Sequence, residues 1–321
     1  MFDLRYRPGS YEDLPHAIPL LQAECESLGA GIWRELPGLI PKLMEAEVVK
    51  TYVIDEGEGE RLRWFGLSAF VAPASLAQAL QRPAIPFRRS LLESALDGGS
   101  PFLTQEQIGA ANAEDNLSLA VLFCQPDLRE YTEVEGGLLF RIAYESFCFA
   151  HEGYGLAEFW QEVSDPKRAL ILAGLGLELH GKVDDSGIAE NVLLKYTAER
   201  AAANPAYAMS FVFHRVLPRF GFSTGQQKLL EAALLGWSDK DFAARHDLTD
   251  DAVKKRWRAI YSRVALLEPT LVDEGSAGSS QRRLLLGYLR RHLEELRPYR
   301  QRRGLETLRS PDRMQEIAVR P

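Results

Sequence analysis

Three helix-starting signals within residues 222–264 constrain the fold of this chain more than any other feature. Ser223, Ser238 and Thr249 each precede apolar residues at helical spacing, and hydroxyl side chains at such positions cap helices by accepting a bond from a backbone amide. Gly236 follows the first apolar run, where glycine can adopt the left-handed conformation that ends a helix. The segment therefore predicts three short helices joined by two tight turns.

The third of these helices is expected to have one apolar face and one basic face. Val253, Trp257, Ile260 and Val264 recur every three or four residues and are predicted to lie in the core. The positive charges fall between them, at Lys254, Lys255, Arg256 and Arg258. A basic helix that follows another helix and a short turn favours insertion into a DNA groove. A merely solvated basic face is the alternative.

Residues 222–264 resemble the LuxR-type helix-turn-helix of bacterial transcription factors. The matching positions are Phe222-Ser223, Leu229-Leu230, Gly236, Ser238, Lys240-Asp241-Phe242-Ala243, Leu248-Thr249, Val253-Lys254, Ile260-Tyr261 and Arg263-Val264. The resemblance implies that Lys254, Lys255 and Arg258 reach bases or nearby phosphates, and that Lys240 and Thr249 contact the DNA backbone. Arg256 stands where a histidine is typical, and we include it among the DNA-binding residues. One such module offers few contacts, so a homodimer on double-stranded DNA is expected.

Charge and composition agree with a cytoplasmic nucleic-acid-binding protein. Residues 251–321 hold 16 Lys and Arg against 9 Asp and Glu, whereas the whole chain has a net charge of −7. An acidic body with a basic end is typical of a nucleic-acid-binding chain. No apolar run approaches the roughly 20 residues that span a bilayer, and no signal peptide is recognisable. We therefore expect a cytoplasmic protein without a membrane partner.

The sequence offers little that indicates catalysis. Cys25, Cys124 and Cys148 lack the spacing of a metal site, and no nucleophile–base pair or phosphate-binding loop is evident. His151 ends a predicted helix, where a histidine interacts with the helix end more often than it acts as a base. We therefore predict no catalytic residues, no metal and no cofactor.

The first 215 residues are predicted to form an α/β domain, because extended and helical segments alternate. Extended segments are expected at 1–6, 48–54, 62–71, 117–124, 156–163, 177–182 and 209–214, with a hairpin turn at 56–59. Helices are expected at 11–25, several times between 75 and 111, and at 137–152, 166–175 and 191–202.

This segment order resembles the GNAT family of acyl-CoA N-acyltransferases. The resemblance rests on Leu4-Arg5-Tyr6-Arg7, on Glu12-Asp13-Leu14-Pro15, and on the elements at 118–124, 137–152, 159–164 and 169–177. It implies a mixed sheet whose second half binds the acyl donor. In place of the family's Gln/Arg-x-x-Gly-x-Gly/Ala loop, however, residues 130–137 read Glu-Tyr-Thr-Glu-Val-Glu-Gly-Gly. Carboxylates there compete with a diphosphate for the positive end of a helix, so we predict a sensor or scaffold domain rather than an enzyme.

The C-terminal end contains a linker, a helix and a tail. Residues 268–280 are predicted to be the linker, in which residues 273–280 are small and polar. Residues 281–303 are predicted to be one helix with a leucine stripe, and residues 304–321 form the tail. The helix is interpreted as a displaced fourth helix used for packing or dimerisation. The alternatives are an arginine-rich arm that touches DNA phosphates, and a helix packed on its own domain.

These observations together predict an α/β N-terminal domain at 1–215, GNAT-like with a mixed sheet, and an all-α helix-turn-helix domain at 219–267. The function predicted first is a DNA-binding transcriptional regulator, not an enzyme, that senses an unidentified small-molecule effector or a partner. Two alternatives stay open. One is an acyl-CoA-dependent acyltransferase fused to a DNA-binding domain, and the other is a constitutive DNA-binding protein with an inert scaffold.

Overall fold

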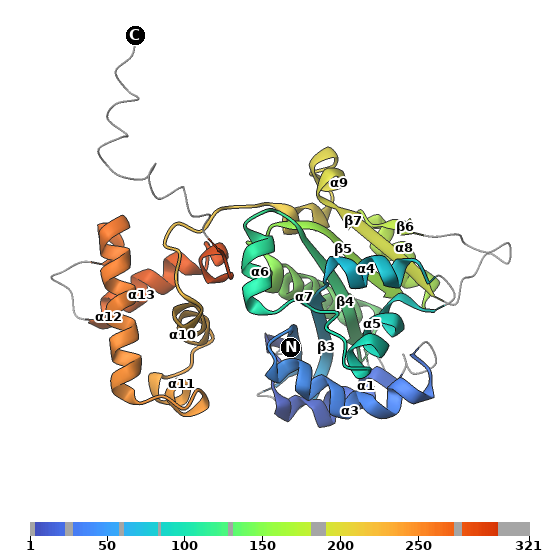
Figure 1. The fold of residues 1–321 in the computed structure, drawn as a ribbon, viewed down its shortest axis with the longest axis horizontal. Helices are drawn as coiled ribbons and strands as arrows, with labels where there is room; N and C mark the ends of the chain where they lie inside the picture. The colour runs from blue at the N-terminus through green and yellow to red at the C-terminus, as the bar shows by residue number, and fades with distance from the viewer. Residues whose placement is uncertain are drawn as a thin grey trace, which may run out of the picture.

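A single mixed sheet organises the N-terminal part of the chain. The computed structural model describes residues 4–22, 28–57, 61–82, 85–127, 131–180, 191–272 and 278–300. The strands are β1 (Leu4–Pro8), β2 (Val49–Glu56), β3 (Arg61–Phe70), β4 (Leu117–Pro126), β5 (Leu156–Val163), β6 (Glu178–His180) and β7 (Val192–Thr197). Their order in the sheet is β1-β2-β3-β4-β5-β7-β6 (Figure 1). Every neighbouring pair is antiparallel except β4 and β5, which are parallel.

Helices cover both faces of this sheet and bury a separate apolar core on each. The helical elements are η1 (Tyr11–Asp13), α1 (Leu14–Leu21), α3 (Ala30–Glu45), α4 (Pro73–Leu80), α5 (Phe87–Leu96), α6 (Gln105–Asn112), α7 (Glu133–His151), α8 (Pro166–Gly174), α9 (Ala198–Ala203) and η3 (Ala208–Phe213). The core on one face includes α1, α3, α4 and α5. The core on the other includes α6, α7, α8, α9 and η3. The predicted α/β domain is therefore confirmed as a mixed sheet between helices.

The hairpin predicted around residues 56–59 is formed by β2 and β3. Tyr52 pairs with Gly66 across the hairpin, and the Tyr52 ring covers the Gly66 backbone so closely that a Cβ at Gly66 would lie 2.0 Å from the ring. Glycine is required here because the aromatic ring occupies the space of any side chain.

The C-terminal helices begin at the hydroxyl residues that the sequence indicates. α10 (Thr224–Leu234), α11 (Asp239–Arg245) and α12 (Asp250–Leu267) are preceded by Ser223, Ser238 and Thr249, each of which accepts a hydrogen bond from a first-turn amide. Gly236 has a φ of 83°, as a left-handed residue after a helix requires. These helices share a core of their own with η4 (Pro269–Leu271), α13 (Gly278–Leu289) and η5 (Leu293–Leu296).

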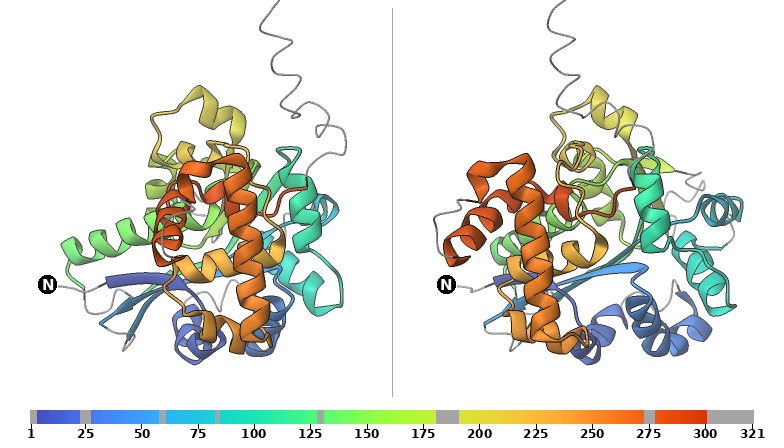
Figure 2. Two further views of the ribbon diagram at one scale, coloured as in Figure 1. Left: turned by 90° about the vertical axis from the view of Figure 1, so that its left-hand side faces the viewer. Right: turned by 60° about the vertical axis from the view of Figure 1, so that its left-hand side comes forward.

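The C-terminal helices lie together beside the sheet, with α12 in front when the molecule is viewed from their side (Figure 2). The segment after α13 attaches them. Arg297 donates to the carbonyl oxygens of Glu152 (2.8 Å) and Phe149 (2.6 Å), and Asn112 donates to the carbonyl oxygen of Pro298 (2.7 Å). The end of the chain described by the structure is thus bonded to α6 and to the end of α7.

Three predictions of secondary structure are wrong. Residues 192–197 are a strand rather than part of a helix at 191–202, because β7 lies between β5 and β6, where its Leu194 and Tyr196 are fully buried. Residues 208–213 form a 3-10 helix rather than a strand at 209–214, which buries Met209 and Val212 on one side.

The predicted helix at 281–303 starts earlier and ends at Leu289, because the chain turns so that Glu295 can bond to the backbone amides of Arg219 and Phe220. The predicted linker at 268–280 contains η4 and the first turn of α13, and its residues 273–277 lie outside the described ranges, as does the predicted tail at 304–321.

Candidate functional site

The parallel strands β4 and β5 pair over only part of their length. Their ladder runs from Leu117 opposite Leu156 to Val121 opposite Gln161. Beyond that point β4 pairs with β3 alone and β5 with β7 alone. We call the unpaired part, residues 122–126 of β4 and 162–163 of β5, the β4–β5 split.

A β-bulge begins where the ladder ends. On β3, Leu67 lies opposite Phe123 and Ser68 lies opposite Val121, so Leu122 is an extra residue that no β3 residue faces in the register. A bulge bends its strand and increases its twist. The bend in β4 therefore accounts for the loss of pairing with β5 directly after Val121.

Two arginine side chains bond to the carbonyl groups of β4 inside the split. Arg88 Nη1 from α5 donates to the Leu122 carbonyl oxygen (3.2 Å), and Arg168 Nη2 from α8 donates to the Cys124 carbonyl oxygen. Residues two apart in a strand direct their carbonyls to the same edge. Since a buried carbonyl without a partner is costly, the guanidinium groups replace the hydrogen bonds that a neighbouring strand would supply.

The first turn of α5 connects the two sides of the split. Glu162 of β5 accepts hydrogen bonds from the backbone amides of Phe87 (2.9 Å) and Arg88 (3.1 Å), and a carboxylate at a helix N-terminus is stabilised by the helix dipole. The Phe87 ring packs on Trp160 of β5 at 6.0 Å, while the Arg88 guanidinium lies 5.2 Å from the Phe123 ring of β4. Arg88 and Glu162 are both buried. The α5 N-terminus therefore spans the split.

Tyr52 and Cys124 are neighbours on the face of the sheet that α7 covers. Cys124 is half-buried, and burial raises the pKa of the neighbouring Tyr52 well above its ordinary value. Tyr52 is consequently a neutral hydroxyl across the physiological range.

Carboxylates occupy the N-terminus of α7, the helix that follows β4. Thr132 and Glu135 form a capping box, in which Glu135 accepts from the Thr132 amide (2.8 Å) and Thr132 accepts from the Glu135 amide (3.4 Å). Hydrogen bonds from Thr132 lower the pKa of Glu135. The helix starts at Glu133, earlier than the predicted residue 137, because this box provides a cap.

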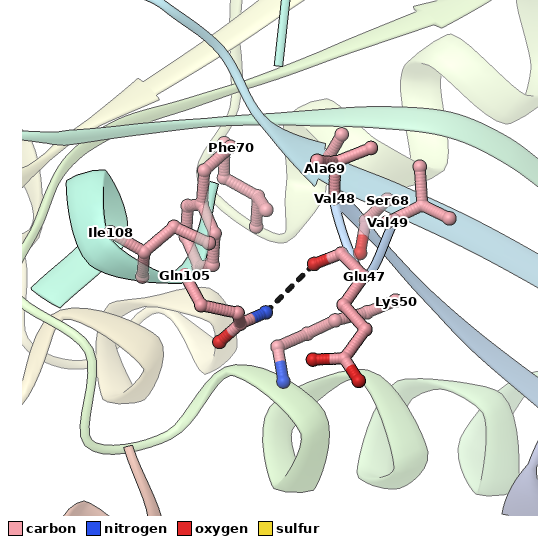
Figure 3. Close-up of a pocket in the computed structure, with 10 residues that line it drawn as sticks. Glu47, Val48, Val49, Lys50, Ser68, Ala69, Phe70, Gln105 and Ile108 are labelled. Carbon is pink, nitrogen blue, oxygen red and sulfur yellow. Dashed lines mark hydrogen bonds between the residues drawn. The ribbon is translucent and has the colours of Figure 1, made fainter. Parts of the chain in front are cut away.

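A small pocket on the α7 face does not provide a substrate site. It lies over Ser68, beside Glu47, Lys50 and Gln105 (Figure 3), and its volume is about 10 Å³. That volume accommodates about one water molecule. Gln105, one of its lining residues, donates to the Glu47 carbonyl oxygen (2.7 Å).

His151 bonds to Ser68, which lines this pocket, and is fully buried. Its Nδ1 is 2.8 Å from the Phe147 carbonyl oxygen, and its Nε2 is 2.8 Å from Ser68 Oγ. Because a carbonyl can only accept, Nδ1 carries the proton and the Ser68 hydroxyl donates to Nε2. Burial lowers the pKa of His151 to about 3. The predicted interaction of His151 with its own helix end agrees with its bond to the Phe147 carbonyl oxygen.

The structure separates the residues predicted to bind DNA. Lys254, Lys255 and Arg258 are exposed together on α12, whereas Arg256 is half-buried with its guanidinium 5.9 Å from the Phe242 ring. The remaining two lie on other parts of the module: Lys240 is exposed on α11, and the Thr249 hydroxyl caps α12.

The described residues contain neither a metal-binding group nor a membrane span. No cluster of three or more His, Cys, Asp or Glu side chains in these ranges could hold a metal ion. Within the same ranges, no helix has the length and apolar character needed to cross a bilayer.

Comparisons with known proteins find similarity only at the level of structure. No protein-family model and no curated protein matches the chain. The spermidine/spermine N-acetyltransferase SpeG from Vibrio cholerae aligns with 63% of this chain and 98% of its own, at 11% identity and a TM-score of 0.36. A polyamine N-acetyltransferase from Drosophila melanogaster aligns with 61% of this chain and 100% of its own, at 14% identity and a TM-score of 0.34. FeeM, an N-acyl amino acid synthase from uncultured soil microbes, aligns with 63% and 94%, at 13% identity and a TM-score of 0.36.

These matches correct the function predicted first. The matched structures are N-acetyltransferases and an N-acyl amino acid synthase. The predictions of a DNA-binding transcriptional regulator and of a non-enzyme are therefore contradicted. The acyltransferase alternative agrees better with these matches. The regulator prediction placed too much weight on the charge of α12. The resemblance of residues 222–264 to the LuxR-type module gains no support from the comparisons. Among the described residues, the N-terminal part of the chain has an α/β fold built on a mixed seven-stranded sheet.

Proposed function

We propose that this chain is an acyltransferase that takes its acyl group from acyl-CoA, with the pantetheine arm of the donor lying in the β4–β5 split. The observation that carries the proposal is the end of the β4–β5 ladder at Val121 and Gln161, together with the bulge at Leu122. This arrangement leaves an edge of β4 inside the sheet without a neighbouring strand.

An extended ligand that contains amide groups can complete such an edge as an added strand. The carbonyls of Leu122 and Cys124 bond to side chains rather than to a strand, and residues two apart in a strand lie about 6.6 Å from each other. The pantetheine arm of CoA is an extended chain with two amide groups. Its two amide N–H groups can donate hydrogen bonds to these carbonyls, as the guanidinium groups of Arg88 and Arg168 do.

Acyl-CoA does not fit the split as the side chains are arranged here. Arg88 and Arg168 hold the two carbonyls, and the α7 N-terminus is bonded to its own Glu135. Binding therefore requires Arg88 and Arg168 to leave the β4 carbonyls. The diphosphate must bind without a free glycine-rich loop at α7.

The C-terminal helices are inferred to form a separate all-α domain, because α10 to η5 share a core cluster of their own. Double-stranded DNA, a small-molecule effector and a second copy of the chain stay predictions as partners. The domain bounds at 219–267 and a cytoplasmic location stay predictions as well.

Calorimetry with acetyl-CoA tests the proposal, and adenosine 3′,5′-bisphosphate, which lacks the pantetheine arm, is the matched control ligand. We expect acetyl-CoA to bind measurably more tightly than the control, because only acetyl-CoA can pair with β4. Release of free CoA thiol on addition of primary amines is then expected. Equal affinity for the two ligands, or no binding of either, would contradict the proposal.

A further inference from the structure

The N-terminus of α5 lies across the β4–β5 split, where the acyl donor is proposed to bind. The helical segment between β3 and β4 places the α5 N-terminus where it contacts both strands of the split: Glu162 of β5 through two backbone amides, and Leu122 of β4 through Arg88. Only 3% of Arg88 is exposed, so its guanidinium cannot leave the split without movement of the α5 N-terminus.

A second arginine closes the split from the opposite face of the sheet. Arg168 belongs to α8, whose Ala169 is part of the core on the α7 side, whereas Phe87 of α5 is part of the other core. Arg168 donates to the carbonyl two residues beyond the one that Arg88 holds. The two guanidinium groups therefore occupy successive positions on one strand edge, each delivered by a different helix.

We propose that Arg88 and Arg168 form an autoinhibitory gate, which closes the β4–β5 split and opens only when the α5 N-terminus moves away. This inference rests on the acyltransferase proposed above, and it concerns the regulation of the same site. When only a small fraction of a protein is in the state that binds a ligand, the apparent affinity for that ligand is reduced by that fraction. The gate thus lowers the affinity of the chain for its acyl donor.

The gate can be tested by removing the guanidinium of Arg88 while keeping its apolar stem. Arg88→Met eliminates the bond to Leu122 and retains most of the packed volume. A charge-assisted hydrogen bond of this kind corresponds to a change in a binding constant of about tenfold or more. We expect calorimetry to give a Kd for acetyl-CoA about tenfold lower in Arg88→Met than in the wild type.

Arg89→Met is the matched control, because Arg89 is the next residue of α5 and bonds to Glu93 on the helix surface instead of entering the split. Its Kd for acetyl-CoA is expected to equal that of the wild type. Circular dichroism checks that each variant is folded. If Arg88→Met does not fold, Arg168→Met is measured in its place, since Arg168 is only half-buried, and the same decrease in Kd is expected.

The outcomes separate the gate from the function on which it rests. A lower Kd in Arg88→Met, or in its substitute, with an unchanged Kd in Arg89→Met supports the gate. Measurable binding with the same Kd in the wild type and the arginine variant overturns the gate but leaves the acyltransferase in place. No binding by any of these proteins overturns both.

Discussion

Protonation of His151 is expected to destabilise the folded chain as the pH falls below 6.5. His151 is buried between Ser68 of β3 and the Phe147 carbonyl of α7, and both ring nitrogens are bonded in the neutral form. Burial is the main reason that its pKa falls from 6.5 to about 3, and the positive charges of Lys50 and Arg297 add to the effect, whereas the Phe147 carbonyl opposes it.

The direction follows from proton binding in the two states. Between pH 6.5 and about 3 the unfolded chain binds a proton at His151 that the folded chain does not, so stability rises with pH across this window and is lost as the pH falls. Each pH unit below 6.5 costs at most about 1.4 kcal/mol. At pH 5 the loss from this residue alone is therefore about 2 kcal/mol.

His151→Phe isolates this contribution, because phenylalanine keeps the ring packed on Phe147 but cannot bind a proton. Urea unfolding of both proteins at pH 7 and pH 5 gives the difference in their free energies of unfolding. Contributions from carboxylates cancel in that difference, since both proteins share them. We expect the free energy of unfolding of the wild type, relative to that of His151→Phe, to fall by about 2 kcal/mol from pH 7 to pH 5. A difference that is the same at both pH values would refute the reasoning.

Two further substitutions test the packing of the chain. Gly66→Ala places a Cβ 2.0 Å from the Tyr52 ring and is expected to lower the free energy of unfolding by about 3 kcal/mol or more; in urea unfolding, its cost should be much smaller in a Tyr52→Ala background, and equal costs would contradict this contact. Glu295→Gln leaves one acceptor oxygen for the backbone amides of Arg219 and Phe220 and should cost about 1–3 kcal/mol. Thermal unfolding monitored by circular dichroism measures the Glu295 effect, and an unchanged midpoint would show that these bonds do not stabilise the C-terminal helices.

Features with a local physical cause were predictable from the sequence. Ser223, Ser238 and Thr249 cap their helices because the bond from hydroxyl to amide spans three residues and depends on little else. The hairpin of β2 and β3 and the strand β5 were also predictable, because aromatic, aliphatic and β-branched residues mark them.

Features that depend on distant neighbours were not predictable. Residues 192–197 form a strand because β5 and β6 pair with them from both sides, and residues 198–203 alone favour the helix predicted there. The candidate site was missed for the same reason. Glu162 and Arg88 are 74 residues apart in sequence. Glu162 lies in a mostly buried strand, and Arg88 is the second residue after Pro86. A charged residue within an otherwise buried strand such as β5 was the available signal.

Hydrogen exchange of β4 with and without acetyl-CoA tests the central proposal most directly. Residues 119–121 pair with both β3 and β5 and are the internal control, whereas residues 123–125 pair with β3 alone and Leu122 is the bulge residue. We predict that acetyl-CoA slows exchange between residues 122 and 125 and leaves residues 119–121 unchanged, because the donor completes the strand edge. Unchanged exchange at residues 122–125 with acetyl-CoA bound would contradict the assignment of the β4–β5 split as the donor site.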